Sequence, residues 1–313
     1  MVALAISALA IFLLIEKVNL RAALGDVGHI SIRLVLLVVA LNIPTTLLRA
    51  LRSQVLVRHL GHRVPFLRMN GVDLAGQTLS WITPAATGDL SRPYLWRNHD
   101  RVPVSAGVAV VIYERLVTLA QMGAVGGVLA AAVYLPPAAV LGIAAAALVV
   151  LAGPWWLSLV TRHYSGPGLG VGRRGLVGGL LRSLDQLQEL GRSARLTALF
   201  AVITLLVFVI SGLQVLLLVW GVKAAVGLGV AVAAFCLSQV AGSVSTLPFG
   251  IGATDVVTIA LLVAGGVPRL DAVAVTVLVR LVMTLPLGTA GALGILILGR
   301  PRLPADEPAA SRS

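Results

Sequence analysis

Long apolar runs, separated by short segments rich in arginine, dominate this chain. Residues 138–160 and 196–220 contain no charged side chain. A helix that crosses the hydrocarbon core of a bilayer needs about 20 apolar residues, and runs near this length recur along the sequence. Only 12% of the 313 residues are charged, whereas soluble proteins average about 25%. We therefore predict an all-α, polytopic integral membrane protein of the plasma membrane, with about seven or eight spanning segments.

The net charge of +12 does not predict nucleic-acid binding, because the arginines cluster between apolar runs, as the positive-inside bias produces. The densest group contains five arginines and no acid: Arg49, Arg52, Arg58, Arg63 and Arg68. We interpret this group as a basic segment at the cytoplasmic surface and place both termini in the cytoplasm. Membrane lipids, especially anionic ones, are the expected partners. The sequence does not predict an oligomeric state.

The predicted organisation is a single transmembrane domain over residues 1–303, followed by a disordered tail over residues 304–313. Residues 2–15 are apolar with no Lys or Arg before them, which indicates a retained membrane helix rather than a cleaved signal. Leucines on one face predict an amphipathic helix between the halves. The predicted parts are a first half at 1–160, a cytoplasmic linker with this amphipathic helix at 161–195, and a second half at 196–303.

Two matching sets of helix breakers, each followed by an arginine, divide the predicted membrane domain. The first set has spacings of 4, 15 and 12 residues and the second has spacings of 4, 16 and 12. The sets are Pro84, Gly88, Pro103 and Arg115, and Pro248, Gly252, Pro268 and Arg280. Irregular backbone at membrane depth is tolerated only where protein or a water-filled cavity covers it. We therefore predict two broken or re-entrant helices, with tips at Pro84 and Gly88 and at Pro248, Gly250 and Gly252.

The predicted passes bring the first broken helix in from the cytoplasm and the second from outside. This arrangement is an inverted-topology repeat, in which transporters place their site at the midplane between two halves. Two alternatives stay open. The matching spacings can arise by chance, because Pro and Gly are common here, and residues 66–97 can instead form a surface loop flanked by two amphipathic helices.

Ionisable side chains inside the predicted membrane segments are the candidate binding residues, because each needs a partner or water to persist there. Arginine holds phosphate through paired hydrogen bonds, and we assign this role to Arg115 and Arg280. The carboxylates would neutralise these arginines or bind a cationic headgroup. The candidates for substrate binding are Asp73, Asp89, Arg92, Glu114, Arg115, Asp255 and Arg280. We expect each tip to face the arginine that follows it across a shared cavity; the alternative is that the ion pairs only lock helices together.

The sequence contains no metal-ligand carboxylate cluster, no paired catalytic histidines and no nucleophile motif. Cys236 is the only cysteine, which excludes an intramolecular disulfide and a site built from several thiolates. We therefore expect no catalytic residues, no metal site and no cofactor.

The order and spacing of these motifs resemble the lysylphosphatidylglycerol synthase transmembrane-region family, flippase-like integral membrane proteins, over roughly residues 1–300. The motifs are the basic segment after the second apolar run, Pro84-x-x-x-Gly88, Glu114-Arg115, Leu247-Pro248-x-Gly250-x-Gly252-x-x-Asp255, and Arg280 followed by Gly288. Family members usually have Glu where Asp255 stands, and often an Asp shortly after the Glu-Arg pair, where this chain has Leu116, Val117 and Thr118.

The resemblance implies translocation of a phospholipid or lipid-linked molecule between leaflets. In the aminoacyl-lipid synthases of the family a separate soluble domain transfers the aminoacyl group, so we expect no such transfer by this chain alone. Two alternatives remain: an integral-membrane enzyme acting on a lipid phosphate or an isoprenoid-linked sugar, and a non-catalytic helper subunit of a lipid-modifying synthase.

Overall fold

The computed structural model describes residues 30–151, 176–245 and 247–298. Every regular element in these ranges is a helix, which confirms the all-α prediction. Four helical segments are long and apolar enough to cross a membrane: Ile32–His59, Val104–Tyr134, Ala194–Gly221 and Arg269–Leu298. Three shorter apolar helices accompany them, at Pro137–Leu151, Leu228–Val244 and Ala253–Ala264. These segments support a multi-pass membrane protein. The predicted helix at 2–15, the linker residues 161–175 and the tail at 304–313 lie outside the described residues.

The first long segment consists of α3 (Ile32–Ala40) and α4 (Asn42–His59), which meet at Leu41. Pro44 lies in the first turn of α4, where its missing N–H is tolerated, and it cannot donate to the carbonyl of Ala40, at which α3 ends. The proline therefore lies at the start of α4 and does not interrupt the helix, which continues to His59.

The predicted broken helix begins with α5 (Phe66–Ile82), passes through the 3₁₀ segment η1 (Pro84–Ser91) and continues as α6 (Arg92–Asp100). The amide of Gly88 donates to Oγ1 of Thr83 over 2.7 Å, which folds η1 back along α5. A Cβ at Gly88 would overlap the backbone of Leu79 and Ser80. Glycine is therefore required at this close approach.

The remaining described elements are also helical. After the long helix α7 (Val104–Tyr134), α8 (Pro137–Leu151) runs back beside it. The later elements are α10 (Leu176–Arg192), α11 (Ala194–Gly221), α12 (Leu228–Val244), the short 3₁₀ turn η2 (Pro248–Gly250), α13 (Ala253–Ala264), α14 (Arg269–Leu278), the π-helical segment η3 (Val279–Thr284) and α15 (Leu285–Leu298).

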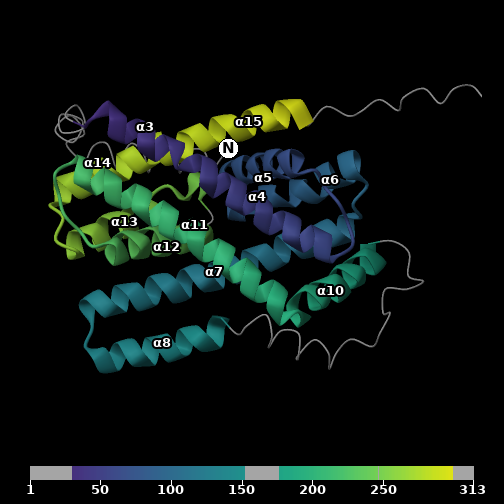
Figure 1. Cartoon of the computed structure of the whole chain (residues 1–313), viewed down its shortest axis with the longest axis horizontal. Helices are drawn as coiled ribbons and strands as arrows, with labels where there is room; N and C mark the ends of the chain where they lie inside the picture. Colours follow the sequence, from purple (N-terminus) through teal and green to yellow (C-terminus); the bar gives the residue numbers. More distant parts are fainter. Residues whose placement is uncertain (1–29, 152–175, 246, 299–313) are drawn as a thin grey trace, which may run out of the picture.

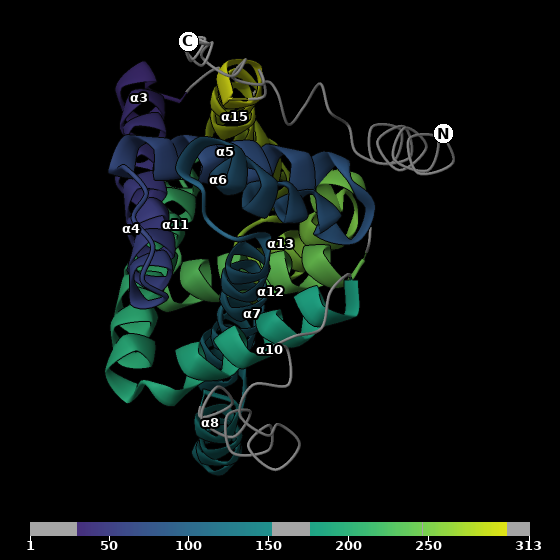
Figure 2. The same cartoon turned by 90° about the vertical axis from the view of Figure 1, so that its right-hand side faces the viewer.

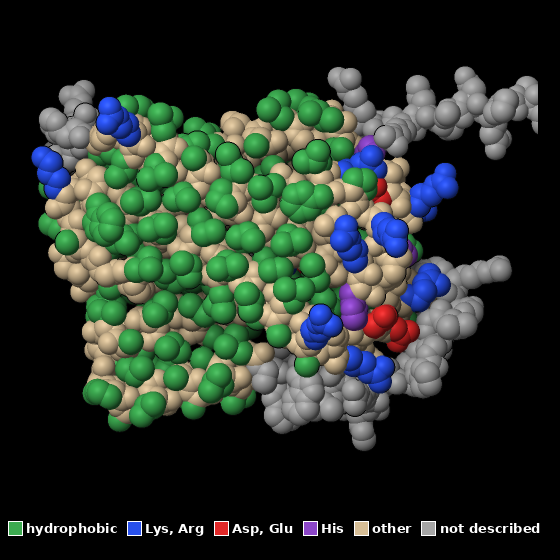
Figure 3. All heavy atoms as spheres, in the orientation of Figure 1, with side chains coloured by type: hydrophobic (Ala, Val, Ile, Leu, Met, Phe, Trp, Pro, Cys, Tyr) green, Lys and Arg blue, Asp and Glu red, His purple; other side chains and the backbone are tan. Residues whose placement is uncertain are grey.

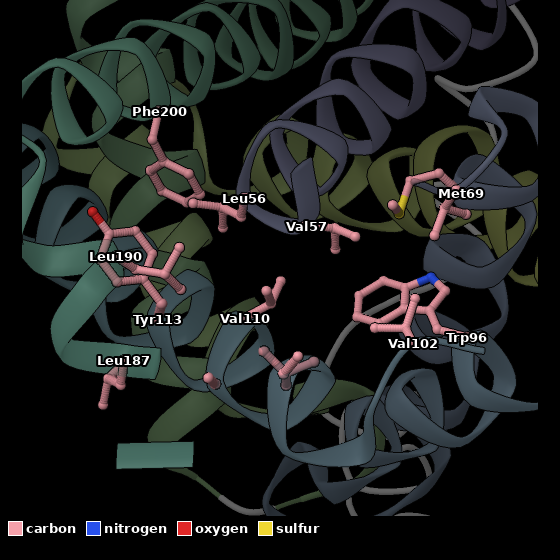
Figure 4. Packing of buried hydrophobic residues seen from close by; sticks show 14 of the residues in the cluster. Leu56, Val57, Met69, Trp96, Val102, Val110, Tyr113, Leu187, Leu190 and Phe200 are labelled. Carbon is pink, nitrogen blue, oxygen red and sulfur yellow. The ribbon is translucent and has the colours of Figure 1, made fainter. Parts of the chain in front are cut away.

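Helices that are far apart in the sequence pack against each other. The last helix, α15, lies beside α5, and α12 lies beside α7 (Figures 1 and 2). A Cβ at Gly291 would overlap Oγ1 of Thr78 and the carbonyl oxygen of Leu74, so glycine lets α15 approach α5 closely. A hydrophobic cluster beside this contact joins α4, α6, α7, α10 and α11 through Leu56, Trp96, Val110, Leu190 and Phe200 (Figure 4).

The outer surface separates apolar from charged side chains. On the face shown in Figure 3, hydrophobic side chains cover most of the helical bundle, and most of the Lys, Arg and His side chains gather at the end that holds α6 and α10. Exposed apolar side chains such as Leu141, Leu206 and Leu296 belong to this broad hydrophobic surface. A surface of this kind suits contact with lipid chains, with the charged end at the membrane–water boundary.

Candidate functional site

A polar cavity of about 270 Å³ lies inside the bundle. The residues that line it come from α4 to α7 and α11 to α15, together with η1, η2 and η3. Its charged lining consists of five arginines and four carboxylates: Arg49, Arg52, Asp73, Asp89, Arg92, Glu114, Arg115, Asp255 and Arg280. Every ionisable candidate chosen from the sequence therefore lines one shared cavity.

The first tip holds the arginine that follows it in the chain. Nε of Arg115, on α7, donates to Oδ2 of Asp89 over 2.7 Å, and Nη2 forms an ion pair with the same carboxylate. Nη2 also donates to Oγ of Ser80, near the end of α5, over 3.1 Å. The bonds tie η1 to α7 at the cavity wall.

The second tip repeats this arrangement with a bidentate pair. Arg280 donates from Nε to Oδ1 of Asp255 over 2.9 Å and from Nη2 to Oδ2 over 2.8 Å. Nη2 also donates to Oγ1 of Thr254 over 2.9 Å. Arg280 lies in the π-helical segment η3, a helix type that is frequent at functional sites. At both tips, an aspartate therefore binds the arginine that follows the tip in the chain.

Asp255 also stabilises the start of α13. Its Oδ2 accepts the backbone N–H of Gly252 over 2.9 Å, so the carboxylate caps the helix as well as binding Arg280. The chain reaches this position through three residues of positive φ: Phe249 at 56°, Gly250 at 60° and Gly252 at 89°. The two glycines adopt this backbone conformation without strain, whereas residues other than glycine, such as Phe249, rarely adopt it.

Arg92 is the centre of a buried ion network. Its Nη1 donates to Oε2 of Glu114 and its Nη2 to Oδ1 of Asp73, both over 2.6 Å. Oγ of Ser53 accepts from Arg92 over 2.9 Å and donates to Asp73 over 2.6 Å. Arg92 is 5% exposed and Glu114 is 3% exposed. The network joins α4, α5, α6 and α7. Its opposite charges attract one another, which offsets the cost of removing them from water.

The interpretation of Arg49 and Arg52 as part of a basic surface segment is wrong. Both residues line the cavity, and Arg52 is only 8% exposed. The positive-inside bias counts arginines without regard to the face of the helix on which they lie. A helical signal was present in the sequence: Asn42, Thr45, Arg49 and Arg52 follow one another at intervals of 3, 4 and 3 residues, which places them on one face of α4.

The two tips meet beside the cavity. The ring of Trp81, at the end of α5, lies 6.2 Å from the ring of Phe249 in η2, measured between centroids. Gly250 lines the cavity, whereas Gly88 and Gly252 shape the backbone behind it. The side chains of Pro84 and Pro248 lie outside the described part of the structure. Within the described part, no three His, Cys, Asp or Glu side chains are grouped to hold a metal ion.

Comparison with models of known protein families gives a match over most of the chain. The family model described as "Lysylphosphatidylglycerol synthase TM region" matches residues 1–291, which is most of the chain. A search of curated protein sequences gave no significant match. The family match covers both tips, both Asp–Arg pairs and the Arg92 network. The chain therefore belongs to the lysylphosphatidylglycerol synthase transmembrane-region family.

Proposed function

We propose that the protein moves a phospholipid or a lipid-linked molecule between the two leaflets of the membrane. The observation that carries this proposal is the single cavity in which nine charged side chains from both parts of the chain meet, inside a bundle with an apolar outer surface. The polar headgroup passes through the cavity while the acyl chains stay in the surrounding lipid.

The energetic need for such a cavity follows from the cost of moving charge through hydrocarbon. A charged group at the centre of a bilayer costs about 2.5–3.5 kcal/mol on insertion scales and more in the absence of water. Arginine, carboxylate and hydroxyl groups already held in place replace the hydration of a headgroup. The cavity lowers the barrier by supplying these groups without reorganisation.

The tips support a proposal of two related halves that enter from opposite sides of the membrane. Each tip aspartate binds an arginine a similar distance along the chain, 26 residues for Asp89 and Arg115 and 25 residues for Asp255 and Arg280. Inverted-topology halves allow a central site to open to each side in turn. In this proposal Arg115 and Arg280 exchange their aspartates for the lipid phosphate as the headgroup passes.

The proposed activity leaves the lipid covalently unchanged. A lipid recovered after transport therefore has its original mass. A product of altered mass that depends on the protein would instead favour the alternative of an integral-membrane enzyme.

Transport of a labelled lipid tests the proposal directly. In liposomes that contain the protein, a fluorescent phosphatidylglycerol from the inner leaflet should become accessible to a reductant that cannot cross the membrane. The loss of fluorescence is measured with and without an imposed pH gradient or membrane potential. Arg280→Ala should slow this exposure because it removes one tip pair, whereas Arg269→Ala is a matched control, since Arg269 is exposed on α14. Wild-type transport no faster than in protein-free liposomes would contradict the function, and normal transport by Arg280→Ala would contradict the assigned site.

A further inference from the structure

Arg49 and Arg52 bring two positive charges to the cavity. Neither side chain has an acidic group within ion-pair distance in the described structure, whereas Arg92 has two and Arg115 and Arg280 have one each. We propose that Arg49 and Arg52, named here the α4 arginine pair, bind the phosphodiester anion of the transported lipid. This inference rests on the proposed function, because it identifies the headgroup that the cavity accepts.

The geometry of Arg52 keeps its charge available. Nη1 donates to Oγ1 of Thr118 over 3.1 Å and to Oγ1 of Thr204 over 3.3 Å, and the guanidinium lies 4.9 Å from the centre of the Phe200 ring. All these partners are neutral, so they orient the side chain without cancelling its charge. Nε has no hydrogen-bond partner in the described structure, which leaves this guanidinium incompletely satisfied.

Arg49 lies one helical turn before Arg52 and lines the same cavity. Residues three positions apart are neighbours on a helix surface, and like charges there repel. The acids nearest in the cavity offset this repulsion only in part, because Asp73 and Glu114 bind Arg92 and Asp89 binds Arg115. Two neighbouring cations in a largely buried site favour an anion between them.

The charge balance of the cavity indicates the class of anion. Five arginines face four carboxylates, so the lining has one net positive charge. A phospholipid phosphodiester has one negative charge, which neutralises the lining. Arginine binds such an oxyanion through paired N–H donors. At the α4 arginine pair, unlike at Arg115 or Arg280, binding displaces no carboxylate.

Binding of short-chain probes to the purified protein in an uncharged detergent tests this inference. The probes are dihexanoyl phosphatidylglycerol, dihexanoylglycerol, which lacks the phosphate, and inorganic phosphate, measured by titration calorimetry. The phospholipid should bind, and dihexanoylglycerol should bind at least tenfold more weakly. Inorganic phosphate should also bind more weakly, because it lacks the acyl chains. Equal affinity for inorganic phosphate and the phospholipid would show a free-phosphate site and overturn the lipid assignment.

Variants on α4 locate the binding site. Arg49→Gln and Arg52→Gln should each weaken phospholipid binding about tenfold or more, as expected for loss of hydrogen bonds to a charged group. Arg52→Lys should give an intermediate affinity, because it keeps the charge but loses the planar fork. Arg58→Gln is the matched control, since Arg58 is exposed on the same helix and should bind as wild type does.

Arg49→Gln keeps the test decisive if Arg52→Gln folds poorly, because Arg49 makes no side-chain hydrogen bond in the described structure that folding would lose. Unchanged binding by a folded Arg49→Gln protein would overturn the inference. If such a variant binds normally while wild type transports lipid, the α4 pair is excluded and the proposed function stands. If the variants lose binding but wild type transports nothing, the anion site stands and the proposed function fails.

Discussion

Asp255 offers a test of how the second tip is stabilised, because its carboxylate both caps α13 and binds Arg280. Asp255→Asn keeps a side-chain oxygen that can accept the N–H of Gly252, the N-cap residue of α13, but removes the charge. Breaking a buried ion pair costs about 3–5 kcal/mol. The Asp255 side chain is 4% exposed, but that of Arg280 is 29% exposed and keeps its bond to Thr254, so we expect a smaller loss, of about 2–3 kcal/mol.

Asp255→Ala removes the cap as well and should cost about 1 kcal/mol more than Asp255→Asn. The free energy of unfolding, measured in mixed micelles with increasing denaturing detergent, gives both values. In a double-mutant cycle, Arg280→Gln combined with Asp255→Asn should be less destabilising than the sum of the single changes by at least about 1 kcal/mol. Equal stability of the Asn and Ala variants, or additive effects in the cycle, would refute the dual role of Asp255.

Two glycine substitutions test the close contacts that the helices make. Gly88→Ala should lower the free energy of unfolding by about 1–3 kcal/mol, because the new methyl group overlaps the backbone of Leu79 and Ser80. Gly127→Ala on α7 is the control and should be near neutral in the same assay, because a Cβ there meets nothing within 4 Å. Equal effects of the two changes would refute the packing of η1. Gly291→Ala should separate α15 from α5 and cost a similar amount, and a distance between spin labels on the two helices that matches wild type, with unchanged stability, would contradict this contact.

Much of the fold followed from patterns that are local in the sequence. The apolar run at 196–220 lies within α11 (Ala194–Gly221), and the described part of the run at 138–160 belongs to α8 (Pro137–Leu151). Helix length and apolar composition determine these elements, because backbone groups in a membrane have to be satisfied within the helix. The pairing of α5 with α15 was not predictable in this way, since it depends on shape matching at Gly291 between distant parts of the chain.

The candidate site was predictable where a charge interrupted an apolar run. Arg115 and Arg280 stood out for this reason, and their pairing with Asp89 and Asp255 followed from the repeated spacing of helix breakers. Arg49 and Arg52 were missed because they lay within a longer basic segment that also fits the positive-inside pattern. The left-handed backbone of Phe249 had no sequence signal, since Phe249 lies between Pro248 and Gly250 and is not itself a glycine.

The central claim is that a lipid headgroup enters the cavity. Its most direct test uses a phosphatidylglycerol analogue with a photoreactive group on the headgroup, irradiated with the protein in liposomes, followed by peptide mass spectrometry. If the headgroup enters the cavity, adducts should form on cavity-lining residues such as Thr118 and Ser211, and they should be lost when unlabelled phosphatidylglycerol competes. Adducts confined to outward-facing residues such as Leu206, which is 48% exposed, would contradict it.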